Sequence, residues 1–573
     1  MITTLGQNGF VTNMEVAIVL IGLLLLDWCV SAGLHRESEI GLRQSSTQML
    51  VMLITRCGFR AVRVAAATLL LAATTFAQII PAQPAPLGPK VPAGSGVCSP
   101  EKSCADLAPG MIQSALGPSP LEENLRTLTD TIGGRVTGSP AAHRAAKWAV
   151  EGFRAAGVDE VHIEKFMIPV GWSEGATHLE VLLPAPFVVH LVSIGWSPAT
   201  PAGGITANLV DVGAGDEAGF ANAGATVNGA IALVHTELLT TWDDLSNEYT
   251  VHPVILGRAI KAGAVAVFWM STRPNLLLYR HNLSINGEIE RLPQAILARE
   301  DAERFARILQ SGQRVRVRLD MPNHVTGPVE SENVVAEIRG REKPDEFVLL
   351  GAHLDSWDLG TGALDDGCND AMLIDAARVI HASGTIPRRS IRFALFTGEE
   401  QGMLGSAAYA RAHRDEMDRM IAAVIFDDGN GPITGFELAG RKDVVQAVRD
   451  ALQPAKSLGV KDFTLDGAGD TDNFDFMLQG IPTLVAIQDP ANYMLNYHAA
   501  SDTFDKVDIA ELKRHVAVAA ITGFALADRP ERIGSRQSRA EIEQLLKDTG
   551  LEQGMRDDGF WPLWQSGERG RLP

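Results

Sequence analysis

The stretch from residue 351 to residue 400 combines acidic side chains and a histidine in a pattern suited to metal chemistry. It opens with GAHLDSWDLGTGALDDG and closes with the strand-like SIRFALFTGEE. An apolar run leads into His353 and then Asp365 at one end, and another leads into Glu399 and Glu400 at the other. Carboxylate and imidazole groups at strand ends are what a hydrolytic zinc site requires. This stretch is therefore our first candidate for a functional centre.

Two further candidate ligands lie beyond this stretch. Asp427 follows the apolar run IAAVIF, and His498 lies in the loop NYHAASDT after the last apolar run. Together with His353, Asp365 and Glu400, they make two histidines and three carboxylates. One tetrahedral zinc ion with an open position needs fewer ligands than this. The set suits two zinc ions that share a carboxylate.

Two more acids are placed to assist such a site. Glu399 and Glu400 are adjacent, so at an extended strand end their side chains point to opposite sides. One can bind metal while the other acts as a general base toward water. Asp355 follows His353 by two residues and is placed to accept a hydrogen bond from the second imidazole nitrogen. Each group alone has an ordinary structural interpretation, and the metal interpretation rests on several strand-end loops carrying them together.

Alternating strand-like and helix-like segments surround these groups. The strand-like segments are ENVVAEIRG, EFVLLGAH, IRFALF, IAAVIFDD and IPTLVAIQD, and helices are predicted over about 369–383, 407–413, 444–452 and 509–527. This rhythm predicts an α/β fold, a three-layer α/β/α sandwich with a mixed, mostly parallel sheet. Ligand sites in such sheets lie beyond the strand ends. Every candidate residue falls there.

The sequence changes character between residues 171 and 328. Short β-type runs such as FVVHLVSIG and AVAVFWM alternate with Gly, Pro and Asn turns, and no acid–histidine cluster stands out. We interpret 171–328 as a β-rich domain inserted into the catalytic domain. The catalytic domain then comprises 118–170 and 329–529. A polar tail over 530–573 follows, and its FWPLW segment is expected to dock on the body of the protein or on a partner.

The first 117 residues predict a targeting region and a linker. Within 1–77, the segment 49–77 has a basic start, an apolar core and a small-residue cleavage site, which is the layout of a signal peptide. An N-terminal membrane anchor is the alternative, and both predict export, either to the periplasm or by secretion. Residues 78–117 are rich in Pro, Gly and Ala and are expected to form a linker or pro-segment. Cys98 and Cys104 are a candidate disulfide pair.

Composition limits the classes of partner. The chain has 573 residues, of which 46% are hydrophobic and 21% are charged, and its net charge is −19. This length suggests two or three domains. The negative charge and the lack of a basic stripe argue against nucleic acid. Membrane contact is expected only if the N-terminal hydrophobic segment is retained, and a homodimer is left open.

The motifs, taken together, resemble a known family. HLDSWDLGTGALDDG, FTGEEQGMLGS and YHAASDTFDKVD are similar to motifs of the dinuclear zinc exopeptidases of the MH clan, which include plasma glutamate carboxypeptidase (carboxypeptidase Q) and bacterial zinc aminopeptidases. The resemblance covers about 121–527. It implies two zinc ions per chain, with these assignments: His353 and Asp427 on one ion, Glu400 and His498 on the other, Asp365 bridging, Glu399 as general base and Asp355 behind His353. Asp428 is the fallback for Asp427.

The resemblance also implies an activity. We expect an exported exopeptidase that hydrolyses dipeptides or short peptides with a free terminus, with aminopeptidase or dipeptidase action favoured. The alternatives, in order, are a carboxypeptidase, a glutaminyl cyclase and a non-catalytic receptor-like module. The inserted region resembles the family's protease-associated (PA) domain, which favours a peptidase over a cyclase. One departure is that Cys368, Asn369 and Asp370 follow the DDG motif where the family has small residues.

Overall fold

The computed structural model describes residues 104–283 and 285–573. The expected signal peptide or anchor, most of the expected linker and Cys98 lie outside these residues. None of the described helices combines the length and the apolar character needed to cross a membrane.

An eight-stranded sheet forms the centre of the catalytic domain, with strand order β1-β11-β13-β12-β14-β17-β15-β16. The strands are β1 (Glu160–Ile168), β11 (Val329–Ile338), β12 (Lys343–His353), β13 (Arg389–Phe396), β14 (Met420–Ile425), β15 (Ile433–Glu437), β16 (Asp462–Thr464) and β17 (Thr483–Gln488). The central strands β13, β12, β14 and β17 run parallel, and β1 and β11 pair antiparallel with their neighbours. β15 pairs antiparallel with β17 and parallel with β16. The predicted mixed sheet is therefore confirmed.

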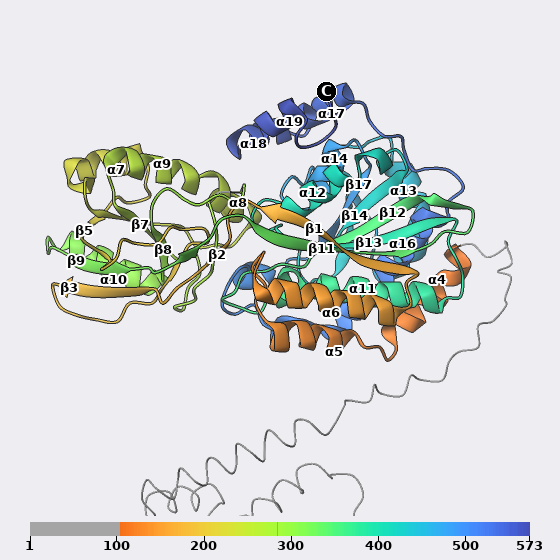
Figure 1. Ribbon diagram of the computed structural model, residues 1–573, viewed down its shortest axis with the longest axis horizontal. Coiled ribbons are helices and arrows are strands. Elements are labelled where there is room, and N and C mark those ends of the chain that lie inside the picture. The colour runs from red at the N-terminus through yellow and green to blue at the C-terminus, as the bar shows by residue number, and fades with distance from the viewer. Residues whose placement is uncertain (1–103, 284) are drawn as a thin grey trace, which may run out of the picture. The chain divides into compact units, whose positions relative to one another are not determined.

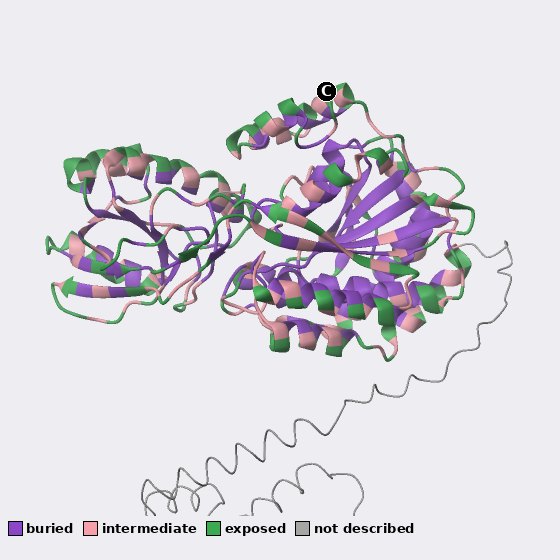
Figure 2. Ribbon diagram, viewed as in Figure 1, coloured by how far each residue is buried: buried purple, intermediate pink, exposed green. Residues whose placement is uncertain are grey.

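Helices cover both faces of this sheet (Figure 1). One face carries α6 (Pro140–Ala156), α11 (Cys368–Ala382) and α16 (Ile509–Asp528), and the other carries α12 (Leu404–Ala412) and α14 (Asn473–Leu478). Along β12, Val348 and Leu350 pack toward the first group, and Leu349 packs toward the second. Successive strand side chains point to opposite faces, so a strand buried on both sides must be apolar throughout. Figure 2 shows the resulting buried interior.

The end of the expected linker is helical instead. Residues 104–116 form α4 (Cys104–Leu116), which packs against α16. Ala108, Met111 and Ala115 are buried on one side of α4, at the spacing of an amphipathic helix. Pro109 and Gly110 lie within this helix, and because such residues are typical of linkers, the sequence analysis assigned the segment to a linker.

The inserted region forms a sheet of its own. Its seven strands have the order β3-β9-β5-β6-β7-β8-β4. They are β3 (His178–Leu183), β4 (Leu191–Ser193), β5 (Ile205–Asp211), β6 (Ile231–Val234), β7 (Ala266–Met270), β8 (Gln294–Leu297) and β9 (Arg316–Asp320). The short strands β2 (Trp172–Ser173) and β10 (His324–Val325) pair where the chain enters and leaves the region.

Helices make the inserted region α/β rather than β-rich, so the prediction was wrong in this respect. They are α7 (Glu217–Ala223), α8 (Trp242–Thr250), α9 (His252–Ala262) and α10 (Arg299–Gln310). In α10 the apolar residues Ala302, Phe305 and Ala306 are buried at helical spacing. The apolar runs named in the sequence analysis do contain strands, such as β4 and β7, and the helices lie in the segments between such runs.

The C-terminal tail is also helical. It contains α17 (Arg539–Asp548), α18 (Leu551–Asp557) and α19 (Trp561–Ser566). Phe560 and Trp564 are buried in a cluster with Phe474 and Leu478 of the catalytic domain, and the Arg539 guanidinium lies 3.9 Å from the centre of the Trp564 ring. The expected docking of FWPLW on the body is therefore observed.

Removing the Trp564 ring is expected to loosen this tail. Trp564→Ala leaves a cavity in a packed cluster, and such losses cost about 3–5 kcal/mol. The matched control is Trp561→Ala, because Trp561 is only partly buried and lies against the Arg556 guanidinium. Urea unfolding followed by circular dichroism should show a much larger shift for Trp564→Ala. Equal shifts in the two variants would contradict the docking role.

Candidate metal centre

The predicted ligands gather at one edge of the central sheet. His353 is the last residue of β12, Glu400 follows the end of β13, and Asp427 follows the end of β14. These strands are parallel neighbours, and His353 pairs in register with the last residue of β13. Their carboxyl ends therefore meet at the same edge, where α/β sheets bind ligands.

Two groups of ligand atoms form there. His353 Nε2 lies 3.1 Å from Asp365 Oδ1 and 3.1 Å from Asp427 Oδ1. His498 Nε2 lies 2.8 Å from Glu400 Oε2 and 3.3 Å from Asp365 Oδ2. Within each group, one ligand atom per residue lies within 4.8 Å of the others. Asp365 belongs to both groups and offers a different oxygen to each.

Burial and charge in these groups fit a bound cation. Glu400 is 7% exposed, and its Oε1 has no hydrogen-bond partner among the described residues. Burial, and then the neighbouring Asp365 carboxylate, raise the pKa of Glu400 well above its ordinary value. A buried carboxylate destabilises the folded protein unless it is paired with a cation or binds metal. Imidazole nitrogen and carboxylate oxygen are the donors that zinc takes in catalytic sites.

The two histidines have different electrostatic surroundings. Burial lowers the pKa of His498 to about 4, so this imidazole is neutral, which is the form that binds metal. Burial also lowers the pKa of His353, but the carboxylates of Asp427 and Asp365 outweigh it and raise that pKa well above its ordinary value. A metal ion between these groups would take the place of that proton.

Asp355 acts differently from the prediction. His353 Nδ1 lies 3.0 Å from the backbone carbonyl oxygen of Asp355, whereas the nearest carboxylate oxygen of Asp355 is 3.8 Å away. The carbonyl is therefore the acceptor that orients His353. The Asp355 carboxylate instead accepts hydrogen bonds from Thr137 Oγ1 at 2.5 Å and from the Glu399 N–H at 3.3 Å. It positions the backbone of the predicted base.

Glu399 lies in surroundings that raise its pKa. Burial raises its pKa, and the Asp427 and Asp472 carboxylates raise it further against the opposing effect of His353, so the result lies well above the ordinary value. Side chains tuned upward in this way accept protons effectively near neutral pH. The adjacent Glu400 carboxylate lies 2.8 Å from His498 Nε2. Both acids lie in the turn after β13, which ends at Phe396, and not at an extended strand end as expected.

Two residues that sequence reasoning missed hold the loop of Asp365. Asp502 accepts hydrogen bonds from the backbone N–H groups of Leu364 at 2.7 Å and Asp365 at 3.2 Å. Arg135 is fully buried and donates to backbone carbonyls of the same loop, those of Leu354 at 2.7 Å, Thr361 at 2.8 Å and Gly362 at 3.0 Å. Asp502 lies in the YHAASDTFDKVD motif that carried the family resemblance, which was the available signal.

The inserted region also reaches the metal centre. Its buried Glu248 carboxylate pairs with the Arg273 guanidinium at 2.6 Å, and the backbone carbonyl oxygen of Glu248 lies 3.3 Å from His281 Nε2. The His281 and His498 rings lie 6.1 Å apart. These residues come from separate elements, and no sequence spacing connects them.

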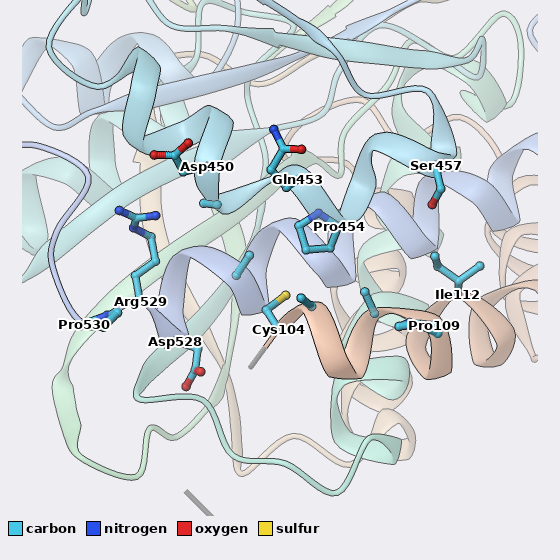
Figure 3. Close-up of a pocket in the computed structure, with 14 residues that line it drawn as sticks. Cys104, Pro109, Ile112, Asp450, Gln453, Pro454, Ser457, Asp528, Arg529 and Pro530 are labelled. Atoms are coloured by element: carbon cyan, nitrogen blue, oxygen red, sulfur yellow. The ribbon is translucent and has the colours of Figure 1, made fainter. Parts of the chain in front are cut away.

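The cavity at the metal centre is small. It has a volume of about 10 Å³ and is bordered by Trp357, Asp365, Glu400, His498 and Asp502, among others. A larger hollow of about 500 Å³ lies elsewhere, between α4, the segment Gln453–Leu458 and the end of α16 (Figure 3). It contains none of the predicted ligands, so size alone does not locate the site.

Asp427 and Asp428 can be distinguished by their neighbours. Asp427 lies beside His353, whereas Asp428 belongs to neither ligand group. Asp427→Asn is expected to weaken zinc binding beside His353 by about 10-fold or more, because a charged ligand is lost. Asp428→Asn should leave the zinc content unchanged. Metal analysis after dialysis checks both variants, and a loss confined to Asp428→Asn would reverse the assignment.

Comparisons with known proteins identify the class. Residues 333–522 match the model of Peptidase family M28. Carboxypeptidase Q of Bos taurus is 30% identical over 418 residues, which cover 72% of this chain and 86% of that protein. The crystal structure of a peptidase M28 precursor from Shewanella amazonensis SB2B is 29% identical with a TM-score of 0.69, covering 76% of this chain and 99% of that one.

A more distant structure shares the fold. A zinc aminopeptidase from Bacillus subtilis is 21% identical with a TM-score of 0.57, covering 73% of this chain and 97% of that one. The fold, the site and these relatives together define a metallopeptidase. The chain belongs to peptidase family M28, and the predicted resemblance to the zinc exopeptidases is confirmed.

Proposed function

We propose that this protein is an exported exopeptidase with two zinc ions, and that it acts on dipeptides or short peptides with a free amino terminus. The observation that carries the two-metal proposal is the position of Asp365. Its two carboxylate oxygens lie 3.1 Å and 3.3 Å from two different histidines. A carboxylate shared in this way is suited to bridge two ions.

The ligand set follows the two groups of atoms. His353 and Asp427 are assigned to one zinc ion, Glu400 and His498 to the other, and Asp365 to both. Bound zinc would polarise the scissile carbonyl and lower the pKa of water. Glu399 takes a proton from the attacking water and then delivers it to the leaving amine. Asp355 holds the backbone of Glu399 in place through its hydrogen bond.

The charge around the site supports recognition of an amino terminus. Burial, and then the Asp427 and Asp472 carboxylates, raise the pKa of Glu399, and burial, and then the Asp427 and Asp470 carboxylates, raise the pKa of Asp428. Carboxylates gathered beside a site attract an ammonium group and disfavour a substrate carboxylate. The carboxypeptidase alternative is kept because the bovine relative has that name.

The domain plan is a further part of the proposal. We assign the inserted region 171–328 to the PA type and keep 118–170 and 329–529 as the catalytic domain, with α4 now added to it. Residues 49–77 are proposed as the export signal.

A panel of peptides tests the specificity. The purified protein is incubated with dipeptides and tripeptides whose amino ends are free or acetylated and whose carboxyl ends are free or amidated. Release of amino acids should require the free amino end and tolerate the amide. The reverse pattern would indicate a carboxypeptidase. Cyclisation of N-terminal Gln without release of amino acids would indicate a glutaminyl cyclase.

A further inference from the structure

His498 differs from His353 in how its ring is held. His353 has an acceptor for its Nδ1, whereas His498 Nδ1 is buried and has no hydrogen-bond partner among the described residues. Histidines that bind metal almost always have such a partner, which fixes the direction of the ring. His498 also has a left-handed backbone, with φ of 56°, a conformation that is strained for residues other than Gly. Other contacts must therefore hold this residue.

The backbone of the inserted region supplies some of these contacts. The N–H of Arg280 donates to the carbonyl oxygen of His498 at 2.9 Å, and the N–H of Ala500 donates to the carbonyl oxygen of Leu278 at 2.9 Å. Between these bonds, Tyr279 forms an antiparallel bridge with Ala499. A strand-like segment of the inserted region thus holds the chain on both sides of the His498 peptide.

Arg273 holds the preceding residue, Tyr497. Arg273 is 1% exposed. One guanidinium nitrogen donates to the Tyr497 carbonyl oxygen at 3.0 Å, another contacts Glu248 at 2.6 Å, and the group lies 3.9 Å from the centre of the Tyr279 ring. The Tyr497 ring in turn stacks on the His498 imidazole, with centres 3.7 Å apart and an angle of 20°. The hydroxyl groups of Tyr249 and Tyr497 are also hydrogen-bonded.

We propose that Arg273 is a positioning residue by which the inserted region presents His498 to the metal position beside Glu400. The inserted region then completes the metal position beside Glu400 and His498. The other, beside His353 and Asp427, is built by β12 and the end of β14 within the catalytic domain. This inference rests on the proposed two-metal function and gives the inserted region a part in assembling the site.

The first variant is Arg273→Lys. A lysine keeps a positive charge beside Glu248. Its compact ammonium group cannot at the same time donate a hydrogen bond to the Tyr497 carbonyl oxygen and stack on the Tyr279 ring. Apo protein is titrated with zinc in competition with a chelator. We expect one of the two binding steps to weaken by about 10–100-fold, the range seen when residues that orient a ligand are removed, while the other step is unchanged.

A matched control separates positioning from stability. Arg389 is equally buried, pairs with Glu346 at 2.6 Å and donates to the Pro530 carbonyl at 3.1 Å. It begins β13, at the opposite end of that strand from the metal centre. Arg389→Lys should therefore leave both zinc-binding steps unchanged. Equal weakening in the two lysine variants would overturn the proposal.

A double-variant cycle locates the weakened step. In a His498→Ala background, Arg273→Lys should cause no additional loss of zinc affinity, because the residue it positions is absent. An additional loss of the same size would overturn the proposal, as would two unchanged binding steps in Arg273→Lys alone.

If Arg273→Lys fails to fold, Tyr249→Phe removes only the hydroxyl contact to Tyr497. It should weaken the same step by about 2–10-fold, and an unchanged step would overturn the proposal. A wild-type protein that binds only one zinc would instead contradict the proposed function.

Discussion

Glu399→Gln is expected to retain both zinc ions and to lose activity by about 100-fold to 10,000-fold, the contribution of a general base. The amide keeps the size of the side chain and its backbone hydrogen bond to Asp355, but it cannot accept the proton of the attacking water. Glu399 is in neither ligand group, so the metal should stay. Zinc analysis and kcat with a dipeptide substrate measure the two effects separately.

The control for this variant is Glu437→Gln. Glu437 is also partly buried, and burial followed by the Asp470 carboxylate raises its pKa to about 7. It belongs to neither ligand group, and kcat should remain within a few-fold of wild type. Full activity in Glu399→Gln would remove Glu399 as the base. Loss of zinc in that variant would make it a ligand instead.

The second large effect is expected from Asp365→Asn. This change removes one negative charge from both ligand groups at once, so both zinc-binding steps should weaken by more than about 100-fold, beyond the range for residues that only orient a ligand. Activity should fall to background. The chelator titration that tests Arg273 measures both steps, and weakening of only one step would show that Asp365 does not bridge.

Asp375→Asn is the control for loss of a buried acid. Asp375 is fully buried and pairs with Arg378 on the same helix at 2.5 Å. Its replacement should lower the free energy of unfolding while both zinc ions stay bound. The comparison with Asp427→Asn, which should weaken one step only, completes the series.

The sequence was sufficient to predict the central sheet and the set of acids and histidines that gather at its edge. Strands such as β14 are buried along their whole length, and buried parallel strands must be apolar, so their ends are easily recognised. Parallel neighbours end at the same edge, which brings the acids after β13 and β14 close to His353. The apolar pattern of the strands and the geometry of the parallel sheet therefore predict the same location for this part of the site.

Contacts between distant segments could not be predicted in the same way. Arg273 and Tyr497 are far apart in the chain, and their bond depends on how the inserted region packs on the catalytic domain. The acceptor for His353 is a backbone carbonyl, and every residue carries such a group. The tail was taken as polar because its buried residues, such as Trp564, are separated by charged ones along short helices.

Zinc-edge anomalous diffraction from crystals of the purified protein tests the central claim most directly. The account predicts two peaks, one beside His353 and Asp427 and the other beside Glu400 and His498, with Asp365 between them. A single peak, or peaks that do not contact Asp365, would contradict the two-metal site.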